Sequence, residues 1–220
     1  MKTVLAGLCL ALFAVHVNAA DPTLDAILAR MDQAAPNFHG MTADVEMVEY
    51  QKILDDKTTD KGTLKMQREG KKVRAVLTFP DRVIGFLGNI VRIYFPNAQT
   101  YQDYDIGKNS DVLNQFLLLG FGSSGKELAQ SYGITLEGNE KVAGQDTSKL
   151  LLVPKDEKVK ERLSKIEVWI PADSANPVQQ QFYEQTSGNW RRVTYGNTLV
   201  NPPIKGSLEM KLPSGAKKQG

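Results

Sequence analysis

The stretch of the chain that most resembles a chemical motif is Phe116–Glu127, FLLLGFGSSGKE, which contains the spacing G-x-x-x-x-G-K. That spacing is typical of phosphate-binding loops, in which a Ser or Thr after the lysine binds Mg²⁺. The residue after Lys126 is Glu127, whose carboxylate would repel a triphosphate. We therefore expect a glycine loop that turns freely, with no nucleotide site.

Other catalytic patterns are weakly represented. Apart from His16 in the first twenty residues, His39 is the only histidine, which excludes a two-histidine metal site in the rest of the chain. Ser123 and Ser124 lack the G-x-S-x-G frame of a nucleophile elbow. Carboxylates are numerous but scattered over polar segments, so a hydrolase that uses them is the enzymatic alternative. We expect a binding protein, with no enzymatic activity and no metal.

The first residues have the layout of a secretory signal peptide. Lys2 is followed by an apolar run from Val4 to Val15 and by small residues at Asn18 and Ala19. The run is shorter than the roughly 20 apolar residues that a membrane-spanning helix needs. We expect a signal peptide at 1–19 and a single exported, periplasmic domain at 20–220.

Composition limits the classes of partner. The only cysteine, Cys9, lies inside the expected signal peptide, so the exported domain has no disulfide. Leu8 stands where bacterial lipoprotein signals have Gly or Ala, so we expect no acylation. The chain has 27 Lys and Arg against 25 Asp and Glu, which gives a net charge of +2. Such a balance argues against nucleic-acid binding, which usually requires a basic stripe.

The remaining sequence predicts one amphipathic helix and a series of strands. Asp21-Pro22 is a helix start, and an apolar stripe follows at helical spacing until Pro36. From Gly40 onward apolar residues alternate with polar ones, and 55–62 is expected to be a polar turn. Strands are expected at 82–87, 89–95, 99–104, 133–136, 147–153, 165–171, 178–185 and 190–198. Strands at roughly ten-residue spacing are typical of an antiparallel sheet or barrel.

The apolar residues exceed what one buried helix face requires. Phe116 to Leu119 and Phe121 place apolar side chains almost all round a helix. Either this run is fully buried, or it is a lid over a cavity and is covered only part of the time. The residues expected to line a lipid-binding cavity or its lid are Leu24, Ile27, Leu28, Met31, Val45, Met47, Phe79, Phe116, Leu117, Leu118, Leu119 and Phe121.

The order of these features over nearly the whole exported part resembles the outer-membrane lipoprotein carriers, the LolA-like family. The matching segments follow the first helix and read FHGMTADVEMVEY, KGTLKMQREGKKVRAVLTFPDRVIGFLGNIVRIYFP, the strands from Ile166 to Asn197, and NPPIKGSLEMKLPSGAKK. Each motif is short and degenerate, so the resemblance depends on their order.

The resemblance implies a mainly β fold with helices, an incomplete antiparallel barrel of about ten or eleven strands closed by a helical lid. It implies a monomeric periplasmic carrier, without cofactor, that takes acylated lipoproteins from an inner-membrane ABC-type releasing complex to an outer-membrane acceptor. It also implies a basic latch residue in the first hairpin, and Arg68 is the matching position.

Several positions depart from the family pattern. Its K-R-P is Gln67-Arg68-Glu69 here, Arg92 replaces a tryptophan, and Leu208 and Ala216 replace the closing Phe and Val. Two alternatives therefore stay open: a carrier for another lipid or glycolipid, and an envelope-sensor domain of the same fold.

Overall fold

The computed structural model describes residues 22–70, 72–107, 117–204 and 206–219. Its helical elements are α1 (Leu24–Ala34), η1 (Ala35–Asn37), α3 (Gly125–Ser131) and α4 (Glu157–Lys160). Its first strands are β1 (Gly40–Gln51), β2 (Asp56–Glu69), β3 (Lys72–Thr78), β4 (Val83–Leu87), β5 (Ile90–Phe95) and β6 (Thr100–Asp105). The later strands are β7 (Tyr132–Val142), β8 (Gln145–Pro154), β9 (Leu163–Pro171), β10 (Gln179–Glu184), β11 (Trp190–Val200) and β12 (Lys217–Lys218). None of the described helices is long and apolar enough to cross a membrane.

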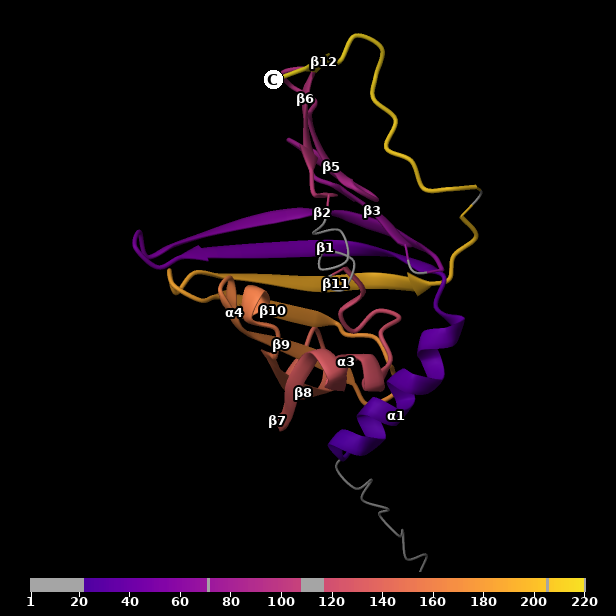
Figure 1. Ribbon diagram of the computed structural model, residues 1–220, viewed down its shortest axis with the longest axis vertical. Helices are drawn as coiled ribbons and strands as arrows, with labels where there is room; N and C mark the ends of the chain where they lie inside the picture. Colours follow the sequence, from indigo (N-terminus) through magenta and orange to yellow (C-terminus); the bar gives the residue numbers. More distant parts are fainter. Residues whose placement is uncertain (1–21, 71, 108–116, 205, 220) are drawn as a thin grey trace, which may run out of the picture.

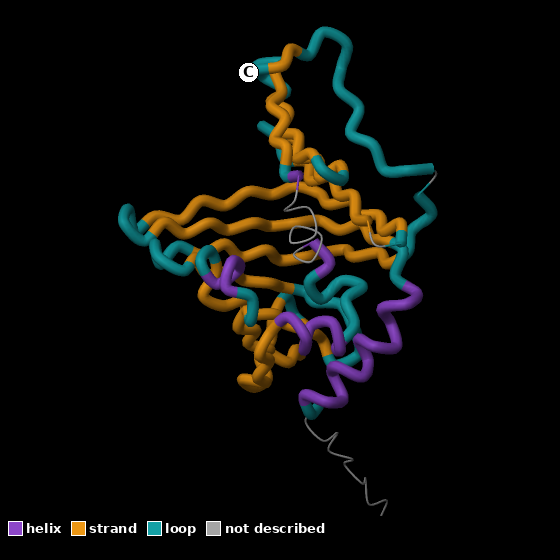
Figure 2. The backbone as a smooth tube through the Cα atoms, viewed as in Figure 1, coloured by secondary structure: helices purple, strands orange, loops and turns teal. Residues whose placement is uncertain are grey.

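The strands of the described residues all belong to one twelve-stranded sheet, in the order β12-β6-β5-β4-β3-β2-β1-β11-β10-β9-β8-β7. Every pairing is antiparallel except that of β12 with β6. Two meanders, β1–β6 and β7–β11, meet where β1 pairs with β11, and within the described residues the outer strands do not pair to close the sheet (Figures 1 and 2). The expected incomplete antiparallel barrel with helices is therefore confirmed.

The first helix begins slightly later than the sequence pattern suggests. Thr23 is the N-cap, and its side-chain oxygen accepts a hydrogen bond from the backbone N–H of Ala26. The expected cap at Asp21 lies outside the described residues. Ile27 and Met31 form the buried face of α1, and Pro36 lies in the 3-10 turn that follows it.

The first hairpin corrects one prediction. The segment 55–62 is not a polar turn, because β2 already begins at Asp56 and pairs with β1 without interruption from Asp56 to Gln67. The turn is shorter and earlier, at 52–55, and Asp55 adopts the positive φ of 46° that ends it. Thr58, Thr59 and Lys61 are exposed strand residues and Asp60 is partly buried, because pairing with β1 supplies the order that their composition does not predict.

Buried side chains form two clusters, one in each half of the sheet. The first cluster belongs mainly to β1, β2 and β3 and includes Met41, Val45, Met66, Ala75 and Phe121. The second lies between α1, α3 and strands β8 and β9; its members are Ile27, Met31, Leu119, Leu128, Tyr132, Leu150, Leu152, Ile166, Val168 and Ile170. Figure 1 shows α1 and α3 beside β7–β10, while β3–β6 extend away from both helices.

The chain after β11 returns along the β2–β6 side of the sheet and ends at β12 (Figure 1). The Gln67 side-chain amide donates to the carbonyl of Gly206 at 2.8 Å, and Met210 lies against Gly85. Gln67, a departure from the family pattern, is therefore a contact for the C-terminal segment.

Candidate apolar cavity and its lid

The first cluster is not filled completely. A cavity of about 690 Å³ lies between β1–β5, the inner ends of β9–β11 and the segment 117–121. That volume falls within the usual range of ligand-binding pockets, about 300–1,000 Å³. Its lining is largely apolar and consists of Val45, Met47, Glu49, Leu64, Met66, Leu77, Phe79, Arg82, Ile84, Phe86, Ile93, Phe95, Leu117, Phe121, Leu163, Gln180, Phe182, Arg191, Val193 and Tyr195.

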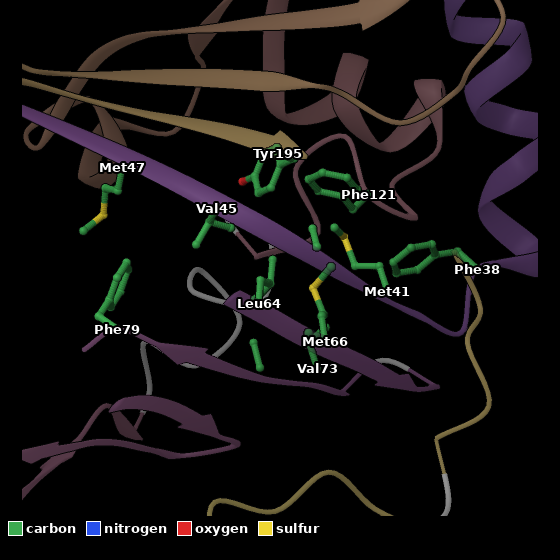
Figure 3. Packing of buried hydrophobic residues seen from close by; sticks show 12 residues of the cluster. Phe38, Met41, Val45, Met47, Leu64, Met66, Val73, Phe79, Phe121 and Tyr195 are labelled. Carbon is green, nitrogen blue, oxygen red and sulfur yellow. The ribbon is translucent and has the colours of Figure 1, made fainter. Parts of the chain in front are cut away.

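Strand alternation explains why these residues share one face. Successive side chains of a strand point to opposite faces, so Val45 and Met47 of β1 face the same way as Leu64 and Met66 of β2. Figure 3 shows Met47 and Phe79 near one another in one part of the cluster, and Phe121 beside Tyr195 in another. The alternation of apolar and polar residues in the sequence therefore produces the apolar surface of the cavity.

The charged lining residues gather at one end of the cavity. Arg191 donates through Nε to Glu49 Oε1 at 2.7 Å, where β11 begins and β1 is about to end. Arg82, in the turn between β3 and β4, forms ion pairs with Asp60 of β2 and with its neighbour Asp81, and its guanidinium lies 4.6 Å from the centroid of the Phe79 ring. Both arginines are therefore neutralised, and the cavity has one polar end.

The other end is covered by the segment 117–121. Leu117 and Phe121 line the cavity, and the Phe121 ring meets the Tyr195 ring edge-on with centroids 4.9 Å apart. Leu118 also packs against the first cluster, whereas Leu119 is buried in the second. The apolar run is thus divided between the cavity and the solid core, which explains its surplus of apolar faces.

Two hydrogen bonds from the sheet, one from each half, hold this segment and the residue that follows it. Arg68 of β2 donates through Nη1 to the carbonyl of Gly122 at 2.7 Å. Gln180 of β10 donates through Nε2 to the carbonyl of Leu119 at 2.5 Å. Tyr195 donates its hydroxyl hydrogen to Gln180 Oε1 at 2.6 Å, and burial raises the pKa of this phenol, which keeps it a neutral donor.

Arg68, the position that the resemblance implies as the latch, thus donates to the residue that follows the segment 117–121. Gln180 and Tyr195 were missed by the sequence reasoning, since nothing in the run Gln179-Gln180-Gln181 distinguishes the middle glutamine. Gln180 is 3% exposed, but its neighbour Gln181 is also buried, at 8%, so the alternation of β10 does not single out the middle glutamine. Its partner, a backbone carbonyl 61 residues away, has no sequence signal.

The glycine loop is a helix start and not a phosphate site. Ser124 and Glu127 form a capping box: the backbone N–H of Glu127 donates to Ser124 Oγ, and that of Ser124 donates to Glu127 Oε2. The N–H of Lys126 donates to Asp32 of α1. These N–H groups already have partners, so they are not available to a phosphate.

The glycines also have a role different from the expected free turning. Gly122 has a φ of 72°, and a Cβ there would lie 2.4 Å from the Phe38 ring. A Cβ on Gly125 would lie 2.5 Å from the carbonyl oxygen of Leu28, at the contact between α1 and α3. Close packing therefore requires small residues here, which corrects the expectation of a loose loop.

The structure separates the residues expected at the cavity into three groups. Val45, Met47, Phe79, Leu117 and Phe121 line it together, and Leu118 packs against the same cluster without being part of the lining. The α1 stripe of Leu24, Ile27, Leu28 and Met31 packs into the second cluster with Leu119, away from the cavity lining. The reason is that α1 runs beside β7–β10, so its apolar face meets β8 and β9. Phe116 lies outside the described residues.

His39 and Arg92, which the sequence analysis singled out, both take part in contacts within the sheet. His39 is exposed directly before β1, and its backbone carbonyl accepts a hydrogen bond from the N–H of Arg68. In the described ranges, no three His, Cys, Asp or Glu side chains gather as a metal site would require. Arg92, which replaces a tryptophan of the family, pairs with Asp103 across β5 and β6 at 2.6 Å.

Comparison with known proteins gives structural matches only. The sequence matches no family model and no curated protein. An uncharacterized conserved protein from Thermus thermophilus shares 10% identity, with 89% of this chain and 97% of that chain covered and a TM-score of 0.53. A putative outer membrane lipoprotein-sorting protein domain from Vibrio parahaemolyticus has 13% identity, coverage of 83% and 93%, and a TM-score of 0.43. A LolA superfamily protein from Nitrosomonas europaea has 12% identity, coverage of 84% and 96%, and a TM-score of 0.38. The similarity to the Thermus protein, at 10% identity, establishes a shared fold.

Proposed function

We propose that this protein is an exported carrier that binds acyl chains in the 690 Å³ cavity and moves them through the periplasm. The observation that carries the proposal is the cavity itself, lined from both halves of the sheet by apolar side chains and covered by Leu117 and Phe121. An unfilled apolar space of this size forfeits packing energy, which favours a role in binding.

The physics of transfer explains why a lid belongs to such a cavity. Each buried CH₂ group contributes about 0.8 kcal/mol, so a long acyl chain crosses water only inside an apolar enclosure. The same gain must be given up at the destination, which requires the cover to open. The segment 117–121 is held by two side-chain donors of the sheet, Arg68 and Gln180, and by Leu119 in the second cluster, so opening would move Leu117 and Phe121 while Leu119 stays anchored.

The polar end of the cavity supports an amphiphilic cargo. Glu49, Arg82 and Arg191 are hydrogen-bonding side chains at the boundary of an apolar interior. A lipid with a polar headgroup would place that group beside them and its chains toward Phe121. Acylated lipoproteins meet this description, and so do another lipid or a glycolipid.

In this proposal residues 20–220 form one domain that follows a cleaved signal peptide at 1–19. The protein works as a monomeric chaperone of acylated lipoproteins between an inner-membrane ABC-type releasing complex and an outer-membrane acceptor. The envelope-sensor alternative has no side-chain arrangement of its own in its favour, so the carrier is preferred.

The proposal is tested by adding the purified domain to spheroplasts and analysing lipid extracts of the released complex by mass spectrometry. We expect diacylated lipoproteins in the medium and lipid bound to the protein. Bound lipid without released lipoprotein would indicate that the cargo is another lipid or a glycolipid. Neither lipid nor released lipoprotein would contradict the proposal.

The latch role of Arg68 is tested by Arg68→Leu, which removes the donor to Gly122. A hydrogen bond from a charged group is worth about 1.5–3 kcal/mol, so its loss should weaken the hold on the lid. We expect the variant to take up lipid as the parent does but to differ from the parent in lipid release. Arg74→Leu is the matched control, because Arg74 pairs with Gln67 on the face that contacts the C-terminal segment. Equal transfer by the two variants would contradict the latch.

A further inference from the structure

The tip of the first hairpin presents two apolar side chains to solvent. Ile53 and Leu54 occupy the turn between β1 and β2 and are 90% and 68% exposed. Figure 1 shows this hairpin reaching beyond the neighbouring β10–β11 hairpin at the left of the view. Adjacent aliphatic residues at the end of the longest hairpin cost solubility and contribute nothing to the core, so their position calls for a partner.

The turn is a built structure. The backbone N–H of Lys52 donates to Asn189 Oδ1 of the neighbouring hairpin at 2.9 Å. Tyr50 donates its hydroxyl hydrogen to Asp55 Oδ1 at 2.9 Å, which ties the two sides of the turn together. Ile53 and Leu54 are therefore held in place between anchored neighbours.

Behind the tip lies a layer of aromatic and cationic groups. The rings of Tyr50 and Trp190 are stacked with centroids 5.4 Å apart. The Lys57 ammonium lies 5.7 Å from the Tyr50 ring and 5.6 Å from the Trp190 ring, and the Arg192 guanidinium lies 5.5 Å from the Trp190 ring. Trp and Tyr with Lys and Arg favour the headgroup level of a bilayer, whereas aliphatic side chains favour the acyl region below it.

We propose that this tip, Ile53 and Leu54 with Tyr50 and Trp190 behind them, inserts into the surface of a lipid bilayer. The order from apex to base is aliphatic, then aromatic and cationic, which is the order of environments met on entering a membrane. Two aliphatic side chains are too few for the core of a stable protein interface, which buries about 800 Å² on each partner.

The charges around the tip indicate hydrophobic insertion with little electrostatic attraction. Lys52 and Lys57 are matched in number by Asp55 and Asp56, and Arg191 is paired with Glu49, so the cations of this region exceed the acids only by Arg192. Binding should therefore depend only weakly on salt and on anionic lipid.

The tip lies at the polar end of the cavity. Arg191 follows Trp190 directly in β11, and Glu49 precedes Tyr50 in β1. Insertion of the tip would bring that end to the membrane surface, where an acyl chain could enter or leave without crossing bulk water. This consequence rests on the proposed function, whereas the membrane contact does not.

The test measures sedimentation of the purified domain with phosphatidylethanolamine–phosphatidylglycerol vesicles, together with the emission wavelength of Trp190 in a Trp169→Phe background. We expect a blue shift on binding and a loss of about tenfold or more in partitioning for the double variant Ile53→Asp, Leu54→Asp. Leu199→Asp is the control, because Leu199 is 62% exposed at the far end of β11. Its partitioning should stay within about twofold of the parent, which corresponds to the effect of an ordinary surface substitution.

The outcomes separate this proposal from the carrier function. The tip variant should still bind a fluorescent fatty acid in detergent-free solution, and a variant with a filled cavity should still sediment with vesicles. Absence of vesicle binding by the parent, or equal partitioning by the tip variant and Leu199→Asp, would overturn the membrane proposal and leave the carrier function standing. Binding that occurs only when membrane proteins are present in the vesicles would also overturn it, in favour of a protein partner.

Discussion

The two halves of the sheet follow the same alternating pattern but have different cover. In the half formed by β7–β10, α1 and α3 pack on the sheet, and Ile166 and Ile170 are completely buried. In the half formed by β1–β6, the segment 117–121 covers part of the surface, and the 690 Å³ cavity remains. A strand pattern thus determines which side chains face inward, whereas the position of the helices determines whether that interior is solid.

This difference suggests a division of roles. The solid half supplies stability through close packing, and the open half supplies the space for a ligand. The segment 117–121 belongs to both, since Leu119 is fixed in the solid half while Leu117 and Phe121 cover the open one.

The largest expected effect comes from shortening one isoleucine side chain in each half of the sheet. Ile166→Ala removes a completely buried side chain from the solid half and should lower the free energy of unfolding by about 2–5 kcal/mol. Ile84→Ala, at the half-buried wall of the cavity, should cost markedly less because that side chain already borders empty space. Urea unfolding of both variants measures the difference, and equal losses would contradict the division.

Enlarging two buried valines sharpens the comparison. Val168, 2% exposed in the solid half, and Val45, 3% exposed at the cavity, differ little in burial. Val168→Phe should cost about 1–3 kcal/mol through overpacking. Val45→Phe should be nearly neutral, since its ring can enter the cavity, and should abolish binding of a fluorescent fatty acid. Thermal unfolding and a binding titration report both effects; a severe loss of stability for Val45→Phe would show that the cavity cannot accept a ring.

The smallest effect concerns the outer strands β5 and β6 of the open half. A hydrogen bond from Arg92 lowers the pKa of Asp103 in the pair that joins them. A carboxyl with a lowered pKa in the folded protein contributes stability above its unfolded pKa, near pH 4, and loses it as the pH falls through the folded value. We expect a contribution of about 1 kcal/mol or less.

Unfolding of the parent and of Asp103→Asn between pH 7 and pH 2 measures this pair. The advantage of the parent should be present at neutral pH and decline below about pH 4. An advantage that stayed constant to the lowest pH would show that Asp103 acts through packing and not through its charge.

Local patterns in the sequence predict much of the fold. The alternation of Met41, Ala43, Val45 and Met47 predicts β1 and its inward face, and the expected strands after residue 82 correspond to β4–β11 within two residues, except that β7 continues to Val142, six residues beyond the expected end at 136. The turn at 55–62 was wrong because cross-strand pairing with β1 overrides a polar composition.

The sequence predicted only those cavity residues whose position follows from the pattern of a single strand or a single segment. Val45, Met47 and Phe79 follow from alternation, and Arg68 came from a family resemblance. The α1 stripe was apolar as expected, but its place against β8 and β9 depends on the sheet order, which no local pattern contains. Gln180 and Tyr195 depend in the same way on the contact between β10 and the segment 117–121.

The most direct test of the central claim uses the methionines as reporters on each half. Met47 and Met66 line the cavity, whereas Met31 is buried in the solid half and Met210 lies in the C-terminal segment. A protein labelled with ¹³C at the methionine methyls is titrated with a fatty acid that carries a nitroxide on its chain. We predict strong broadening of the Met47 and Met66 signals, with those of Met31 and Met210 retained. Broadening centred on Met31, or none at saturating fatty acid, would contradict an acyl-binding cavity in the open half of the sheet.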